Sequence, residues 1–167
     1  MPRRQVALHV FPPFAKRVSR PWLRKTALAA LDVALPGRSC QLSLVIADDE
    51  TLHRLNREYR GLDEVTDVLS FSLRHPGQWQ GQSEPPVPKD GREPFPVPPG
   101  VAEPLGEVII SYPQAERQAQ ECEQPLEREL ALLVVHGILH LLGYDHAEPQ
   151  EERAMRAREQ EALARAS

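Results

Sequence analysis

The segment from Leu130 to Leu142 constrains the fold most strongly, because its side chains are apolar on nearly every side at helical spacing. A helix that is apolar all round is buried between other elements. The segment also carries two histidines, His136 and His140. Burying their imidazole rings without partners would cost free energy. The chain therefore needs layers of structure around this helix and a partner for the two rings.

The spacing of the histidines predicts a metal site. His136 and His140 are four residues apart, and residues so spaced lie one above the other on a helix. Gly143 can adopt the left-handed conformation in which helices often end, so the chain can turn back and bring His146 to the same point. Three nitrogen ligands leave a fourth position open, as in catalytic zinc sites. Nickel and iron also accept imidazole ligands. The simpler alternative to a metal site is that each histidine is hydrogen-bonded separately to a backbone carbonyl or a water molecule.

A similar histidine spacing occurs in the metzincin peptidases. Those enzymes need a glutamate directly after the first histidine as a general base. Position 137 is glycine here, and glycine cannot accept a proton. Met155 lies nine residues after His146 in a polar helical stretch, so it does not supply the methionine turn of that class. The sequence therefore disfavours a conventional metallopeptidase.

Length and composition predict one domain, residues 1–167. A chain of 167 residues has room for a single sizeable core. No apolar run approaches the roughly 20 residues that span a bilayer. The N-terminal apolar stretch is interrupted by His9 and by Pro12 and Pro13, which disfavours a signal peptide. Cys40 and Cys122 are too few for a disulfide framework. We expect a cytoplasmic protein without a membrane partner.

Charge is distributed unevenly along the chain. Residues 1–62 carry 11 Lys and Arg against 5 Asp and Glu, a net charge of +6, and residues 63–167 carry 9 against 19, a net charge of −10. The acidic total disfavours binding of nucleic acid through overall charge. The basic N-terminal part offers either a local phosphate-binding face or charges that are simply solvated.

Apolar periodicity and turn residues predict the order β-α-β-α-β-β-α-α-α. Asp48 or Asp49 is expected to cap the second helix, and Ser111 with Gln114 forms a capping-box pattern. Residues 74–104 hold 9 prolines and 4 glycines, which predicts a loop insertion. The strands are expected at 6–10, 42–46, 65–71 and 105–110, and the helices at 21–34, 49–60, 111–124, 125–142 and from 148 onward.

Three blocks of sequence, in this order, resemble the YbeY family of bacterial metal-dependent endoribonucleases, which act in ribosomal RNA maturation. The first block comprises residues 55–61 and 66–71, the second residues 105–107 and the third residues 135–146. The long insertion at 74–104 departs from the compact family pattern. The resemblance implies an α+β fold, with a four-stranded mixed sheet flanked by about five helices and a zinc site at the end of the buried helix.

The resemblance also implies roles for particular residues. His136, His140 and His146 would bind one zinc ion, and Arg60 would be the functional arginine. A guanidinium can grip two phosphate oxygens and stabilise charge that develops in the transition state.

Two acidic residues are the candidates for a general base, Asp67 and Asp145. Asp145 could equally fix the tautomer of a histidine, and Asp67 could form structural hydrogen bonds in a turn.

We therefore expect a zinc-dependent endoribonuclease that prefers single-stranded RNA and acts in rRNA maturation and ribosome quality control. Its partners would be an rRNA precursor and the ribosome or ribosomal proteins, with no role for DNA. The alternatives are a zinc-stabilised ribosome-assembly factor without enzymatic activity and, with less support, a metallopeptidase.

Overall fold

The computed structural model describes residues 3–73, 102–143 and 149–166. Strands and helices follow one another in the predicted order, with one additional 3₁₀ helix after the first strand. In chain order the elements are β1 (Arg4–Val10), η1 (Pro12–Phe14), α1 (Arg20–Ala34), β2 (Cys40–Ala47), α2 (Asp49–Arg60), β3 (Val68–Ser72), β4 (Glu103–Ser111), α3 (Tyr112–Glu121), α4 (Leu126–Leu141) and α5 (Pro149–Ala166).

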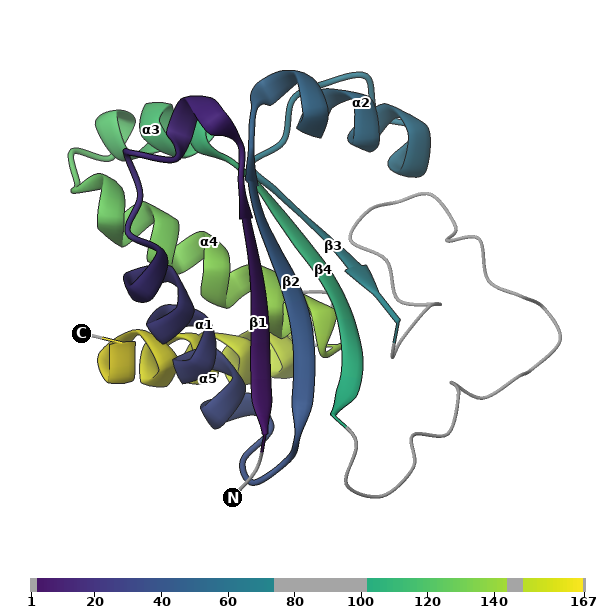
Figure 1. Cartoon of the computed structure of the whole chain (residues 1–167), viewed down its shortest axis with the longest axis vertical. Helices are drawn as coiled ribbons and strands as arrows, with labels where there is room; N and C mark the ends of the chain where they lie inside the picture. The colour runs from purple at the N-terminus through teal and green to yellow at the C-terminus, as the bar shows by residue number, and fades with distance from the viewer. Residues whose placement is uncertain (1–2, 74–101, 144–148, 167) are drawn as a thin grey trace, which may run out of the picture.

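The strands form one four-stranded sheet in the order β1-β2-β4-β3. β1, β2 and β4 run parallel, and β3 pairs with β4 in the antiparallel direction (Figure 1). The helix α1 connects β1 to β2, and the longer connection from β2 to β4 includes α2 and β3. The mixed sheet and the α+β class predicted from the sequence are confirmed.

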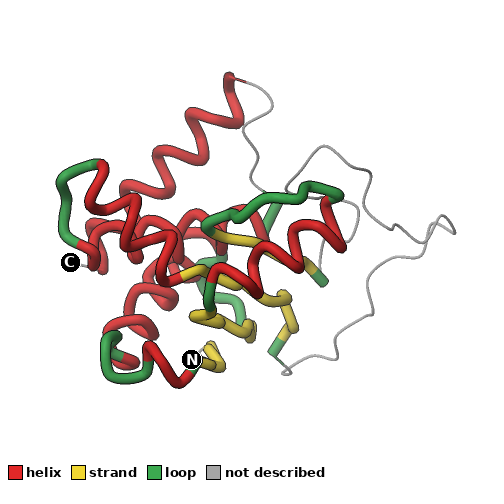
Figure 2. The backbone as a smooth tube through the Cα atoms, turned by 90° about the horizontal axis from the view of Figure 1, so that it is seen from above, coloured by secondary structure: helices red, strands yellow, loops and turns green. Residues whose placement is uncertain are grey.

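The two faces of the sheet are covered differently. α1 and α4 pack on one face, and α5 lies across both helices. On the other face α2 covers one end, where Leu52 is buried against Leu69 and Ile109. Seen from above, most helical segments lie to one side of the strands (Figure 2). The side chains of the sheet that join the larger core include Leu42, Leu44, Ile46, Val68, Val108 and Ile110.

The helix α4 is the centre of this core, as its apolar sequence predicts. Its buried apolar side chains are Leu130, Ala131, Leu133, Val134, Val135, Ile138, Leu139 and Leu141. The two histidines of the helix are half-buried. They therefore stand at the margin of the core, where a ligand can reach them.

The helix caps resolve two expectations. Asp48, and not Asp49, caps α2, because its Oδ1 atom accepts a hydrogen bond of 2.9 Å from the backbone N–H of Thr51. Ser111 caps α3 by accepting a bond of 3.3 Å from the N–H of Gln114. The side chain of Gln114 is hydrogen-bonded to that of Gln118, 3.1 Å away, so only half of the expected capping box forms.

Some boundaries differ from the prediction. β4 begins at Glu103, so the last two residues of the expected insertion belong to the sheet; residues 74–101 lie outside the described part of the chain. β3 begins at Val68 rather than at residue 65. The carboxylate of Asp67 accepts a hydrogen bond from the N–H of Val68, which favours a turn at that point. α3 ends at Glu121, earlier than predicted, and Glu123 follows in a left-handed conformation (φ 51°).

Within the described ranges, no helix combines the length and the apolar character needed to cross a bilayer. Cys40 is buried and Cys122 is exposed, and neither forms a disulfide.

Candidate metal centre

His136 and His140 face one another on α4. Their Nε2 atoms are 3.0 Å apart, and their ring centroids are separated by 4.5 Å. The two rings therefore lie close together, as their spacing on the helix predicts. The third predicted ligand, His146, lies outside the described residues, as does Asp145.

The geometry of the pair fits a shared metal ion. Two nitrogens at about 2.0–2.1 Å from one tetrahedral ion are about 3.3–3.4 Å apart. The observed separation of 3.0 Å between the two Nε2 atoms differs from this by a few tenths of an ångström. The described ranges contain no group of three or more ligating side chains. A complete site would therefore draw its third ligand from outside them.

The end of α4 follows directly after the second histidine. The N–H of Gly143 donates a hydrogen bond of 3.0 Å to the carbonyl of His140. Gly143 itself has a φ of 99°, in the left-handed region that favours glycine. The predicted helix end at this residue is confirmed.

Gly137 lies against the sheet, on a different side of α4 from the histidine pair. A Cβ atom there would be 2.6 Å from Cγ1 of Val108 and 3.1 Å from Cγ2 of Val68. A glutamate, which a metzincin peptidase requires here, would clash with the core. The structure therefore gives a steric reason against the peptidase alternative.

β3 is hydrogen-bonded to α4 beside the histidines. The hydroxyl of Ser70 donates a bond of 2.7 Å to the carbonyl oxygen of Gly137, the residue after His136. This bond adds to the contact between Val68 and Gly137. Together these contacts fix the position of His136 relative to the edge of the sheet.

Arg60 is the last residue of α2 and is half-buried. Burial lowers the pKa of its guanidinium, while the nearby charges of Glu64 and Asp67 raise it. Arginine nevertheless stays charged in proteins. Asp67 immediately precedes Val68, which packs beside Gly137. Asp67 and Val68 therefore link Arg60 to the part of α4 that carries the histidines.

Asp67 is engaged in hydrogen bonds that support the fold. Its carboxylate accepts a bond of 2.8 Å from the N–H of Val68 and one of 3.3 Å from the side chain of Gln118. Its carbonyl accepts a bond of 2.9 Å from the N–H of Ser111 at the end of β4. These contacts favour the structural role of Asp67 over that of a general base.

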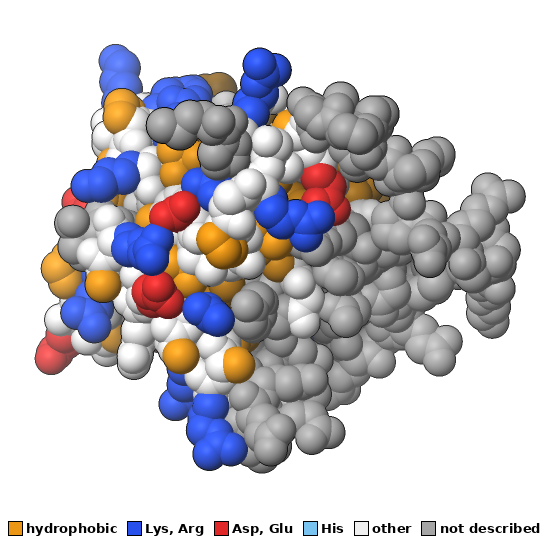
Figure 3. Space-filling view, turned by 90° about the horizontal axis from the view of Figure 1, so that it is seen from below, with side chains coloured by type: hydrophobic (Ala, Val, Ile, Leu, Met, Phe, Trp, Pro, Cys, Tyr) orange, Lys and Arg blue, Asp and Glu red, His pale blue; other side chains and the backbone are white. Residues whose placement is uncertain are grey.

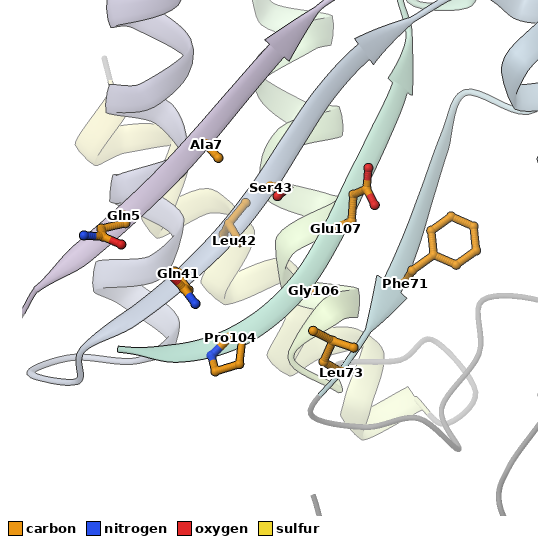
Figure 4. Close-up of a pocket in the computed structure, with 10 residues that line it drawn as sticks. All are labelled: Gln5, Ala7, Gln41, Leu42, Ser43, Phe71, Leu73, Pro104, Gly106 and Glu107. Atoms are coloured by element: carbon orange, nitrogen blue, oxygen red, sulfur yellow. The ribbon is translucent and has the colours of Figure 1, made fainter. Parts of the chain in front are cut away.

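A shallow pocket lies on the face of the sheet away from α1 and α4, with a volume of about 450 Å³. The side chains around it in Figure 4 come from all four strands and mix polar and apolar groups, with Phe71 at one side. Polar side chains that line this pocket are Gln5, Gln41, Ser43 and Glu107.

Phe71 also contacts Tyr59, the neighbour of Arg60. Their rings meet edge to face with centroids 5.3 Å apart. Tyr59 is 47% exposed to solvent. Helical spacing places Tyr59 on the same face of α2 as Leu52, which is fully buried, yet Tyr59 is exposed.

Comparison with known proteins bears on this site. The model of the family described as Endoribonuclease YbeY matches residues 15–167. The chain belongs to the YbeY family.

Curated relatives agree with this membership. A protein of Dehalococcoides mccartyi strain 195, named endoribonuclease YbeY, is 42% identical over 95% of this chain and 88% of its own length. A protein of the same name from Brevibacillus brevis is 43% identical over 74% of this chain and 72% of its own length. The solution structure of TM1509 from Thermotoga maritima matches with a TM-score of 0.58 and 20% identity, covering 96% of this chain and 88% of that one. This last likeness supports the fold alone.

One contact of this YbeY-family site was missed by the sequence analysis. Oε2 of Glu159, on α5, lies 3.5 Å from Nδ1 of His136. Glu159 follows Met155 by four residues and so lies on the same side of the helix as this buried residue, but the polar sequence around Met155 did not mark that side as packed.

Charged side chains are visible on the face of the molecule that is seen from below (Figure 3). Lys and Arg side chains are scattered there, with Asp and Glu side chains between them (Figure 3). The described side chains on this one face therefore form no single basic patch.

Proposed function

We propose that this YbeY-family chain is a zinc-dependent endoribonuclease that prefers single-stranded RNA. In this proposal His136, His140 and His146 hold one zinc ion, and Arg60 binds the phosphate of the bond to be cleaved. The observation that carries the metal site is the separation of 3.0 Å between the Nε2 atoms of His136 and His140. The hydrolase activity is supported by the curated relatives, which are named endoribonucleases.

The histidines supply neutral nitrogen ligands at the margin of the core. Zinc bound there would polarise a phosphate oxygen and lower the pKa of a bound water. The task of α4 is to hold two ring nitrogens in fixed positions, and its burial on the remaining sides makes that position rigid.

Arg60 supplies a positive charge that can interact with phosphate. A half-buried guanidinium interacts more strongly with a phosphate than an exposed one does, because less water screens it. Its planar group can donate two parallel hydrogen bonds to phosphate oxygens. In the proposed reaction Arg60 orients the phosphate and stabilises charge that develops on its oxygens.

The preference for single strands is supported by the surface next to Arg60. The exposed ring of Tyr59 and the ring of Phe71 offer faces on which an unpaired base can stack. The pocket beside Phe71 adds amide, hydroxyl and carboxylate groups that can bond to base edges. A base within a duplex is not free to make these contacts.

We place this activity in rRNA maturation and ribosome quality control in the cytoplasm. Precursor rRNA and the ribosome or ribosomal proteins would be the partners, and neither DNA nor a membrane is expected. The support for this step is the family membership together with the sequence blocks around Arg60 and the histidines.

A comparison of RNA substrates tests the proposal. Zinc-loaded protein is expected to cleave a single-stranded RNA faster than the same sequence in a duplex, and a chelator should abolish both activities. Thermal melting with and without the chelator should accompany the assay. A large loss of melting temperature in a protein that never cleaves RNA would contradict the proposal and favour the assembly-factor alternative.

A further inference from the structure

The inner side of α5 contains one acidic residue among buried apolar ones. Met155 and Ala162 are both 0% exposed. Glu159 is four residues after Met155 and three before Ala162, so the three lie on one side of the helix. A carboxylate on a packed side of a helix needs a partner, because burial of an unpaired charge is unfavourable. A partner would therefore offset the free-energy cost of placing Glu159 on this side of α5.

That partner is a candidate metal ligand. Oε2 of Glu159 is 3.5 Å from Nδ1 of His136, and the two side chains are only 17% and 24% exposed. Arg158 pairs with Glu161 instead, and Arg165 pairs with Glu161 and Asp32. Among the described residues, His136 is the ion-pair partner found for Glu159.

The two nitrogens of His136 are thus in different surroundings. Nδ1 is next to a carboxylate, which accepts a hydrogen bond but cannot donate one when ionised. Nε2 faces Nε2 of His140 at 3.0 Å. A proton placed on Nδ1 leaves the lone pair on Nε2, the atom that a metal would bind. The carboxylate of Glu159 therefore favours the tautomer of His136 with the proton on Nδ1, which leaves Nε2 free to bind a metal.

We propose that Glu159 is a positioning residue of the metal centre. It accepts a hydrogen bond from Nδ1–H of His136 and so fixes both the tautomer and the orientation of the ring. The distance of 3.5 Å exceeds a hydrogen bond by only a few tenths of an ångström, which a small change of side-chain torsion removes. The inference rests on the proposed function, because it assigns Glu159 a task at the same site.

It follows that the C-terminal helix α5 is part of the metal centre. Carboxylates that hold a ligating histidine typically change metal affinity by about 10- to 100-fold when replaced. Glu159→Gln keeps the size of the side chain and removes its charge. Glu161→Gln is a matched control, because Glu161 is exposed on the same helix and its ion pairs involve only arginines of that helix.

The first experiment measures metal affinity by titrating the metal-free full-length chain with Co²⁺ and recording its visible absorption. We expect Glu159→Gln to bind Co²⁺ about 10- to 100-fold more weakly than wild type, and Glu161→Gln to bind like wild type. Both variants should melt at the wild-type temperature in chelator. An affinity of Glu159→Gln equal to wild type would overturn the proposal. A matching loss of melting temperature in chelator would overturn it too, since the role would then be structural.

The second experiment separates this inference from the proposed function. The ¹⁵N chemical shifts of the His136 ring in metal-free protein report which nitrogen carries the proton. The proton is expected on Nδ1 in wild type and in Glu161→Gln, and on Nε2 for a substantial fraction of Glu159→Gln. An unchanged tautomer would overturn the role of Glu159. A wild type that binds no Co²⁺ would overturn the metal site itself, and with it the proposed function.

Discussion

The hydroxyl of Ser70 donates a hydrogen bond of 2.7 Å to the carbonyl oxygen of Gly137. The bond joins the edge strand β3 to α4 directly after His136. A helix that carries metal ligands must hold a fixed register against its support, because small displacements of ligands weaken a site. The hydrogen bond from Ser70 and the close approach allowed by Gly137 together hold α4 in a fixed position against the sheet.

Removal of the Ser70 hydroxyl should reduce stability modestly. Ser70→Ala leaves one lone pair of the Gly137 carbonyl without its side-chain donor, at an expected cost of about 0.5–1.5 kcal/mol in the free energy of unfolding. Urea denaturation of metal-free protein measures this change. An unfolding free energy equal to that of wild type would show that the bond contributes nothing to the register.

A methyl group at position 137 should be more costly. In Gly137→Ala the new Cβ would be 2.6 Å from Cγ1 of Val108, so α4 or the sheet must shift. We expect a loss of about 1–3 kcal/mol in the free energy of unfolding, as for other overpacked cores.

The contact with Val108 can be tested separately. In a Val108→Ala background that methyl group is gone, so Gly137→Ala should cost less there than in wild type. Equal costs in the two backgrounds would contradict the packing explanation.

Replacement of Arg60 should reduce catalysis without removing the metal. Arg60→Ala is expected to lower kcat for single-stranded RNA by about 10²- to 10³-fold, the usual effect of losing one group that stabilises transition-state charge. Arg60→Lys should recover only part of the loss, because an ammonium lacks the planar pair of donors. Arg57→Ala, an exposed residue on the same helix, is the control.

Metal content must be measured beside these rates. If Arg60→Ala cleaves RNA as fast as wild type, or if it is inactive only because it has lost its metal, the proposed contact with phosphate is wrong.

Acid should weaken the junction between α2 and α3. A hydrogen bond from Arg117 (2.9 Å), with a further one from Ser111 (2.8 Å), holds the pKa of Asp49 below its ordinary value of 3.8. The folded pKa is therefore lower than the unfolded one. The resulting stability is present above about pH 4 and is lost as the pH falls through the folded value.

The variant Asp49→Asn tests the predicted direction of this pH dependence. The variant should be less stable than wild type at pH 6, and the difference should narrow as the pH is lowered toward 3 in urea denaturation experiments. A difference that stays constant over this range would mean that Asp49 has the same pKa in the folded and unfolded chain.

Periodicity and caps were sufficient to predict most of the fold. Alternation and helical spacing identified the strands and helices in the right order, and the apolar surround of α4 predicted its burial. The start of β4 at Glu103 was missed because Pro104 looks like part of the loop. Pro104 is tolerated there, since β3 ends opposite Gly106 and no β3 partner faces the proline.

The candidate site was predictable only where its parts are close in sequence. His136 and His140 are one turn apart, so helical geometry alone brings them together. Glu159 approaches His136 through the packing of α5 on α4, and the contact between Ser70 and Gly137 spans 67 positions of the chain. Such contacts depend on tertiary structure, and local spacing does not encode them.

The most direct test of the account compares two histidine substitutions for both metal content and RNA cleavage. His140→Ala removes a proposed ligand, whereas His9→Ala removes an exposed ring from β1, at the opposite edge of the sheet from β3. We predict that wild type and His9→Ala bind metal and cleave single-stranded RNA, and that His140→Ala loses both properties. Cleavage by His140→Ala at the wild-type rate would contradict this prediction.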